Sequence, residues 1–248
     1  MIKAIILDKD GVLLDLDGTW LESALAMCRF LAEQAGPDVP ESLLYDALGV
    51  SPDGKKLYPD GLFAAGSHRQ QLAEVVRRAP SLEALLDENS LLHTQLREVI
   101  QKAYEQTMRR SGPVANGPVA PAIRHLSRAG YKLAVLTNDG EIPASEHCRQ
   151  IGILDAIDMV VGYDSGFGAK PEPNGLLAIC RAFRLRPDEV VMVGDTAADR
   201  LAAEAAGVAH FIGVSARWPD PTAPLVGVAH LIASPADLPQ LIEQLQGR

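Results

Sequence analysis

The chain has 248 residues, of which 47% are hydrophobic and 22% are charged, and its formal net charge is -9. This composition is that of a globular protein with a sizeable core, and it excludes a disordered or fibrous chain. The acidic balance argues against nucleic acid or an anionic membrane as a partner, because the chain has no basic surplus to neutralise their charge.

Short apolar runs predict the buried strands of a parallel sheet, and each run precedes a turn and a helical pattern. The runs lie at residues 4–7, 132–136, 157–161, 190–193, 208–214 and 230–232. Alternation of such strands with helices predicts a doubly wound, Rossmann-like α/β core. Ligands bind such sheets at the carboxyl ends of the strands, so we look for chemistry there.

Two carboxylates follow the first strand directly, at Asp8 and Asp10. Residues two apart on a continuing strand share a face, so both could point into one crevice while Gly11 lets the chain turn away. One carboxylate can attack phosphorus, and a second carboxyl group can protonate the leaving group and later activate water. A solvated turn produces the same letters, so this motif needs support from the rest of the chain.

A second copy of the pattern begins at Asp15, seven residues after Asp8. No strand of its own precedes this copy. We therefore interpret Asp15 and Asp17 as residues of a flanking loop.

Residues 19–111 show helical spacing and no convincing strand. The clearest helices are expected at residues 21–35, 70–78 and 91–108. We predict that 19–111 is an inserted helical domain, and that residues 1–18 and 112–248 form the core.

The strand at 132–136 ends at Thr137 and Asn138. A hydroxyl and a backbone amide at this edge suit phosphate oxygens. A helix cap or an Asx turn is the ordinary structural alternative for this pair.

Lys170 precedes Pro171, and the stiff backbone of proline could hold the ammonium group over the site. Such a cation would offset developing negative charge. The alternative is an ordinary surface lysine.

Asp195 lies at the tip of the strand at 190–193, and Asp199 follows one helical turn later. The i, i+4 spacing aligns the two side chains. Magnesium prefers hard oxygen ligands, so Asp195 could bind it directly while Asp199 holds a ligand water or Lys170. A helix-capping aspartate and a surface acid are the structural alternatives.

These patterns occur in order along the chain and together resemble the four sequence motifs of the haloacid dehalogenase superfamily of hydrolases. The resemblance covers the whole chain. The matching residues are Asp8-Lys9-Asp10-Gly11, Thr137-Asn138, Lys170 and Gly194-Asp195 with Asp199.

The resemblance implies a doubly wound core with a helical cap that closes over a magnesium-bound phosphate. It implies that Asp8 is the nucleophile and a metal ligand, and that Asp10 is the acid/base and binds the metal through its carbonyl. Asp195 would complete the Mg2+ site, supported by Asp199. The residues expected to hold the phosphoryl group are Gly11, Thr137, Asn138 and Lys170.

The motif at Asp8, with Thr19 and Trp20 after it, is similar to the phosphoglycolate phosphatase-like branch. Asp10 argues against dehalogenation, because the true dehalogenases lack this aspartate. We expect an Mg2+-dependent phosphatase acting on a small phosphorylated metabolite, with cap segment 59–67 as a candidate specificity element. A phosphomutase of the β-phosphoglucomutase type and a non-catalytic ligand-binding protein stay as alternatives.

Three widely spaced cysteines and an N-terminus without a signal-peptide pattern favour a reducing, cytoplasmic location. No apolar run is long enough to predict a membrane span. The sequence does not fix the oligomeric state.

Overall fold

The computed structural model describes residues 1–215, 225 and 227–247, which form two compact units. Unit 1 consists of Met1–Asp15 and Ala115–Arg248, and unit 2 consists of Leu16–Val114. The domain boundaries expected from the sequence, after residues 18 and 111, lie a few residues from these bounds.

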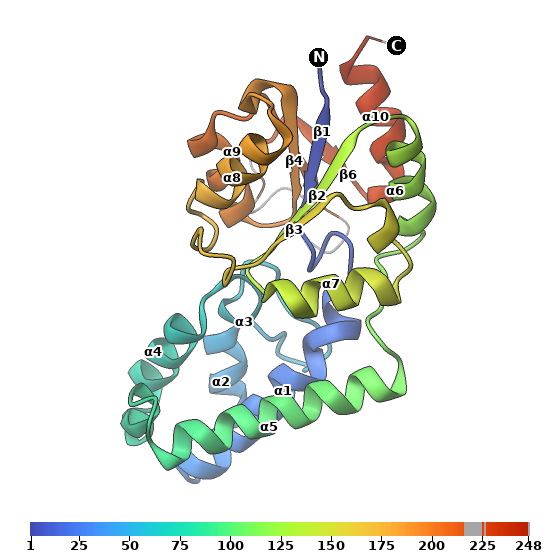
Figure 1. The fold of residues 1–248 in the computed structure, drawn as a ribbon. Helices are drawn as coiled ribbons and strands as arrows, with labels where there is room; N and C mark the ends of the chain where they lie inside the picture. Colours follow the sequence, from blue (N-terminus) through green and yellow to red (C-terminus); the bar gives the residue numbers. More distant parts are fainter. Residues whose placement is uncertain (216–224, 226, 248) are drawn as a thin grey trace. The chain divides into compact units, whose positions relative to one another are not determined.

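Unit 1 is built on a parallel sheet with the strand order β3-β2-β1-β4-β5-β6 (Figure 1). The strands are β1 (Ala4–Leu7), β2 (Lys132–Leu136), β3 (Met159–Val161), β4 (Val190–Gly194), β5 (His210–Val214) and β6 (His230–Ile232). The order reverses at β1, because β2 pairs on one side of it and β4 on the other. The doubly wound fold class predicted from the sequence is confirmed.

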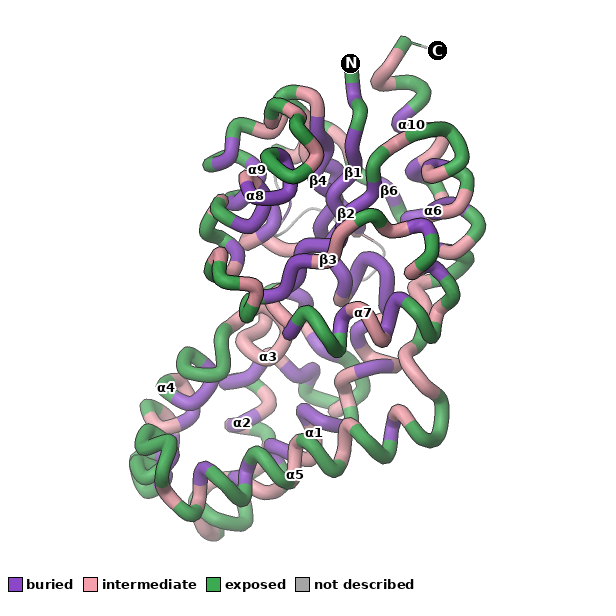
Figure 2. Tube along the Cα trace, viewed as in Figure 1, coloured by how far each residue is buried: buried purple, intermediate pink, exposed green. Residues whose placement is uncertain are grey.

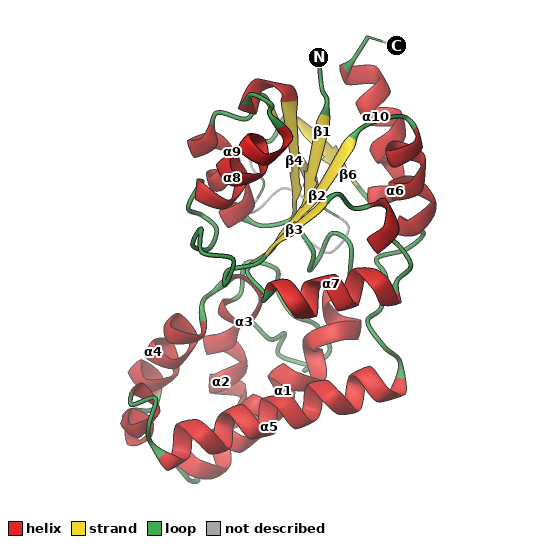
Figure 3. Ribbon diagram, in the orientation of Figure 1, coloured by secondary structure: helices red, strands yellow, loops and turns green. Residues whose placement is uncertain are grey.

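Helices cover both faces of this sheet (Figure 3). They are α6 (Val119–Arg128), α7 (Glu141–Gln150), α8 (Asn174–Phe183), α9 (Ala197–Ala206) and α10 (Leu238–Leu245). Alternate strand residues serve opposite faces. In β1, Ile5 packs in the cluster that contains Ile123 of α6, whereas Ile6 packs in the cluster that contains Ile179 of α8.

Two predicted strands are longer than the strands in the structure. β3 begins at Met159 because residues 154–156 form a short 3-10 turn that ends at Ile157. β5 begins at His210 because the backbone amide of Val208 closes the end of α9 on the carbonyl of Ala203. The prediction was therefore wrong at residues 157–158 and 208–209, where local turns satisfy the backbone.

Unit 2 is helical among its described residues and has a hydrophobic core of its own (Figure 2). Its helices are α1 (Leu16–Ala35), α2 (Glu41–Leu48), α3 (Leu62–Ala65), α4 (His68–Arg78) and α5 (Leu91–Arg110). Each of the longer helices α1 and α5 buries one stripe of side chains. No helix among the described residues has both the length and the apolar character needed to cross a membrane.

The interpretation of Asp17 as a loop residue was wrong. Asp17 lies in the first turn of α1, which begins five residues earlier than the sequence suggested. Its carboxylate accepts a hydrogen bond of 2.7 Å from the backbone amide of Leu57. Asp15 therefore ends the first segment of unit 1, and the rest of the second aspartate pattern starts helix α1 of unit 2.

Ile5 of the central strand β1 is fully buried, so we expect its truncation to have a large effect on stability. Ile5→Ala should lower the free energy of unfolding by about 2–5 kcal/mol, because it removes buried methylene groups and leaves a cavity. Ile142→Ala is the matched control, since Ile142 is 82% exposed. Urea denaturation followed by circular dichroism measures both, and equal effects would contradict the assigned core.

Candidate active site

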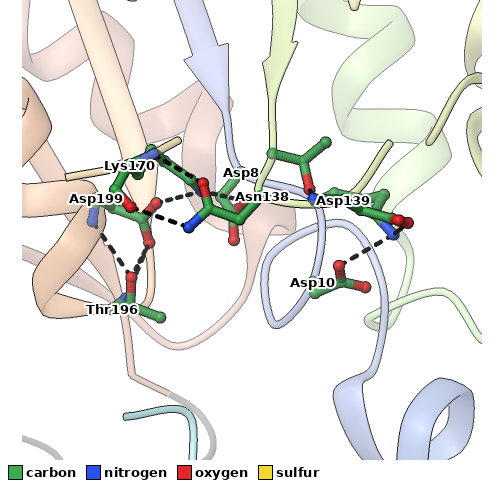
Figure 4. A network of polar contacts seen from close by, with 9 residues as sticks. Asp8, Asp10, Asn138, Asp139, Lys170, Thr196 and Asp199 are labelled. Atoms are coloured by element: carbon green, nitrogen blue, oxygen red, sulfur yellow. Dashed lines mark hydrogen bonds and ion pairs between the residues drawn. The ribbon is translucent and has the colours of Figure 1, made fainter. Parts of the chain in front are cut away.

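The carboxyl ends of three neighbouring strands carry the polar residues singled out from the sequence. Asp8 follows β1, Thr137 follows β2 and Asp195 follows β4. The register aligns these ends, because Leu7 of β1 pairs with Val135 of β2 and with Val193 of β4. The motifs therefore meet at one edge of the sheet (Figure 4).

Three buried carboxylates form a possible cation site there. Asp8, Asp195 and Asp199 each offer an oxygen, and these atoms lie within 4.8 Å of one another. Gly11 adjoins them with φ +82°, and a Cβ at this residue would lie 1.9 Å from Asp195 Oδ2. A glycine is needed here on both counts. Hard oxygen donors crowded in this way fit a divalent cation such as Mg2+.

Lys170 balances part of this negative charge. Its Nζ lies 2.5 Å from Asp8 Oδ1 and 2.6 Å from Asp199 Oδ1, and the side chain is almost completely buried. Burial alone would lower the pKa of Lys170, but Asp199 and Asp8 outweigh it and raise that pKa. The lysine therefore stays an ammonium group between two carboxylates.

The carboxyl group of Asp8 has a raised pKa. Burial raises its pKa from 3.8 to about 7. The charge of Lys170 opposes this shift, and the charges of Asp199 and Asp10 add to it. A buried carboxylate surrounded by other acids gains most from a bound cation.

Asn138 makes a different contact from the one expected. Its side-chain oxygen accepts a hydrogen bond of 2.8 Å from the backbone amide of Lys170, and its amide donates at 3.1 Å to the Lys170 carbonyl. Thr137 is buried, and its hydroxyl accepts a hydrogen bond of 3.1 Å from the backbone of Asp139. Asn138 therefore fixes the loop that carries the lysine.

Asp199 combines its predicted contact with a capping role. Its Oδ2 accepts hydrogen bonds from the Thr196 hydroxyl at 2.6 Å and from the Thr196 amide at 3.0 Å. Its Oδ1 accepts a hydrogen bond from Lys170 Nζ. Contact with Lys170 was one of the two roles that the sequence suggested for Asp199, the other being contact with a metal-bound water. The start of α9 thus holds the carboxylate in place.

Sequence reasoning missed a second buried lysine. Lys9 Nζ lies 3.0 Å from Asp10 Oδ2, 2.8 Å from Asp139 Oδ2 and 3.1 Å from His147 Nδ1. Burial alone would lower the pKa of Lys9, but Asp10 and Asp139 raise it. Burial and then the charge of Lys9 lower the pKa of His147 to about 4. Asp139 and His147 lie 130 and 138 residues after Lys9, so no local sequence pattern could reveal their contacts with it.

This geometry places a buried carboxylate beside a buried lysine at the carboxyl edge of the sheet, and it agrees with a match to a known family. The family model for haloacid dehalogenase-like hydrolases matches residues 2–207. The chain belongs to this family. Membership in the hydrolase superfamily expected from the sequence is confirmed.

Relatives with assigned functions indicate to which branch of the family the chain belongs. The chain is 32% identical over 201 residues to a phosphoglycolate phosphatase of Vibrio vulnificus, covering 79% of this chain and 80% of the relative. It is 28% identical over 206 residues to a phosphoglycolate phosphatase of Nitrosospira multiformis, covering 83% and 80%. The chain thus lies in the phosphoglycolate phosphatase-like branch of the family. It is a hydrolase of the phosphatase type.

Solved structures agree on the fold. A predicted phosphoglycolate phosphatase from Haemophilus somnus superposes with a TM-score of 0.71 at 20% identity, covering 97% of this chain and 98% of that one. A β-phosphoglucomutase from Clostridium difficile superposes with a TM-score of 0.69 at 17% identity, covering 100% and 98%. At these identities the likeness concerns the fold alone.

The raised pKa of Asp8 predicts a pH-dependent stability in the absence of metal. Between pH 3.8 and about 7 the folded protein holds a proton on Asp8 that the unfolded chain has lost. The contribution of Asp8 to the free energy of unfolding therefore decreases as pH rises through this window. Asp8→Asn should reduce the difference between unfolding free energies measured in EDTA at about pH 4.5 and pH 7.5.

The matched control for this prediction is Asp155→Asn, at an exposed aspartate paired with Arg124. It should keep the wild-type difference between the two pH values. An unchanged difference in Asp8→Asn would show that Asp8 does not titrate in this window.

Proposed function

We propose that the chain is an Mg2+-dependent phosphatase that hydrolyses a small phosphate monoester through an aspartyl phosphate on Asp8. The observation that carries this proposal is the buried Lys170 ammonium, which contacts Asp8 and Asp199 beside the carboxylate of Asp195. A buried lysine next to a carboxylate suits the transfer of a dianionic phosphoryl group, because it offsets negative charge on the phosphoryl oxygens.

Asp8 and Asp10 take separate roles in this proposal. Asp8 attacks phosphorus, and Asp10 gives a proton to the departing oxygen. Asp10 then takes a proton from the water that attacks the aspartyl phosphate. Asp10 is more exposed than Asp8, which supports its role as the group that meets the leaving group and water.

Asp8, Asp195 and the backbone carbonyl of Asp10 would hold Mg2+, with Asp199 as a supporting carboxylate. When bound, the ion supplies positive charge that neutralises the phosphoryl oxygens. The three clustered carboxylate oxygens support this assignment. Lys170 acts on the same charge from its contact with Asp8.

The phosphoryl group would be held by Lys170, the Thr137 hydroxyl and the backbone near Gly11. Phosphate contact by Asn138 stays a prediction, since the amide of this residue already holds the backbone of Lys170. The role of Asn138 that the contacts favour is to keep Lys170 in position.

Unit 2 is proposed to act as the cap that selects the substrate. Its segment 59–67 contains α3 and the serine that caps α4. The names of the relatives favour phosphoglycolate or a similar small carboxylated phosphate as substrate. The cytoplasmic location stays a prediction.

The nucleophile provides the decisive test of the reaction. Asp8→Asn should lower kcat for phosphoglycolate by at least about a thousandfold, because an amide cannot form the phosphoenzyme. Release of inorganic phosphate with Mg2+ measures the loss. Asp155→Asn should keep wild-type activity, and an active Asp8→Asn protein would overturn the mechanism.

The same assay separates the alternatives. Chelation of divalent ions should abolish phosphate release, and added Mg2+ should restore it. A phosphomutase would instead require or release a sugar bisphosphate and produce little free phosphate. A non-catalytic protein would release no phosphate from any phosphomonoester in a panel that includes an aryl phosphate.

A further inference from the structure

The side chain of Lys9 is fully buried in unit 1, although it lies between two residues of the proposed reaction site. Its backbone carbonyl accepts hydrogen bonds from the amides of Leu13 and Leu14, at 2.8 and 2.9 Å. The main chain at this position is therefore fixed by the turn that follows β1. Neither the phosphoryl transfer nor the metal site proposed above uses the ammonium group of Lys9.

The ammonium group of Lys9 is surrounded by hydrogen-bond acceptors. It has three N–H donors, and the acceptors within 3.1 Å among the described residues include Asp10 Oδ2, Asp139 Oδ2 and His147 Nδ1. A lysine has no acceptor, so His147 must accept through Nδ1. These contacts restrict both the position and the rotation of the ammonium group.

The partners of Lys9 are themselves held by the core. Asp139 Oδ1 accepts a hydrogen bond of 2.7 Å from the amide of Gly140, and His147 is a buried residue of α7. The side chains of Asp10 and Asp139 are partly exposed to a similar degree, 20% and 21%, whereas His147 is buried. Figure 4 shows Asp10 and Asp139 close together on one side of the site. Lys9 therefore links the carboxylate of Asp10 to a backbone-bound carboxylate and a buried imidazole.

A buried lysine is expensive unless its charge is matched, and apolar side chains would fill the same space at lower cost. Among the partners of Lys9 named here, Asp10 belongs to the proposed chemistry, whereas Asp139 and His147 do not. This division suggests that Asp139 and His147 hold Lys9 in place, and that Lys9 in turn holds the carboxyl group of Asp10.

We propose that Lys9 is a positioning residue that fixes the carboxyl group of Asp10 for proton transfer, and that Asp139 and His147 hold Lys9. The proposal rests on the function proposed above. In the first half-reaction the bond from phosphorus to the leaving oxygen breaks, and that oxygen takes the proton of Asp10. In the second, a water oxygen bonds to phosphorus, the bond to Asp8 breaks, and Asp10 takes a proton from the water.

The test compares two leaving groups in a Lys9→Met variant, with Mg2+ present. The alkoxide that leaves an alkyl phosphate such as phosphoglycolate needs a proton on its oxygen. The p-nitrophenolate that leaves p-nitrophenyl phosphate is a weak base and departs without one. Because kcat/KM reports the steps up to leaving-group departure, Lys9→Met should lower kcat/KM at least about tenfold more for the alkyl phosphate. An equal loss for both substrates, or no loss, would overturn the positioning role.

Two further variants keep the test decisive if Lys9→Met does not fold. Asp139→Asn and His147→Gln each remove one support of Lys9, and both should produce the same selective loss to a smaller degree. Thermal unfolding by circular dichroism checks that each variant is folded. A loss in these variants that does not depend on the leaving group would contradict the proposal.

Lys132→Met is the matched control. Lys132 is also ion-paired, 2.5 Å from Asp158, but it is exposed and lies at the start of β2. Its replacement should leave both kcat/KM values unchanged. Wild-type protein without activity on either substrate would overturn the proposed function, whereas active wild type with an unselective Lys9→Met overturns only the positioning role.

Discussion

The contact between Lys170 and its two carboxylates organises the site. Asp8, Asp195 and Asp199 are all buried, and a set of buried acids without a cation would be costly. Lys170 reaches Asp8 from a loop distant in sequence, and Asn138 holds the backbone of that loop from the end of β2. The site therefore depends on the parallel register that brings these strand ends together.

Several residues serve structure and chemistry with the same side chain. Asp199 caps α9 through one carboxylate oxygen and binds Lys170 through the other. Asn138 holds the backbone of the Lys170 loop, and its contact with phosphate stays a prediction. A structural contact therefore does not argue against a functional one, because a capped or braced side chain has less freedom to lose when substrate binds.

The sequence predicted the sheet core and the motif residues because strand-end aspartates and short apolar runs depend on local patterns. Asp8 and Asp195 were placed at one edge of the sheet for this reason, whereas Lys170 was placed there by the resemblance to the family. The starts of α1 at Leu16 and of β3 at Met159 were predicted at the wrong residues, since tertiary contacts and turns decide where these elements begin. Lys9 was missed as well, because its partners Asp139 and His147 come from distant parts of the chain.

The segments that lead into and out of unit 2 are joined to each other within unit 1. Leu14 forms an antiparallel bridge with Ala115, and the amide of Asn116 donates to the carbonyl of Leu13 at 3.0 Å. The Asn116 side chain also bonds the Gly11 carbonyl at 2.9 Å. Since the two ends of the insertion meet at a hydrogen-bonded base, inserts of very different length would close at similar entropic cost. The whole inserted unit can therefore be exchanged in evolution while the aspartates at the strand ends keep their surroundings.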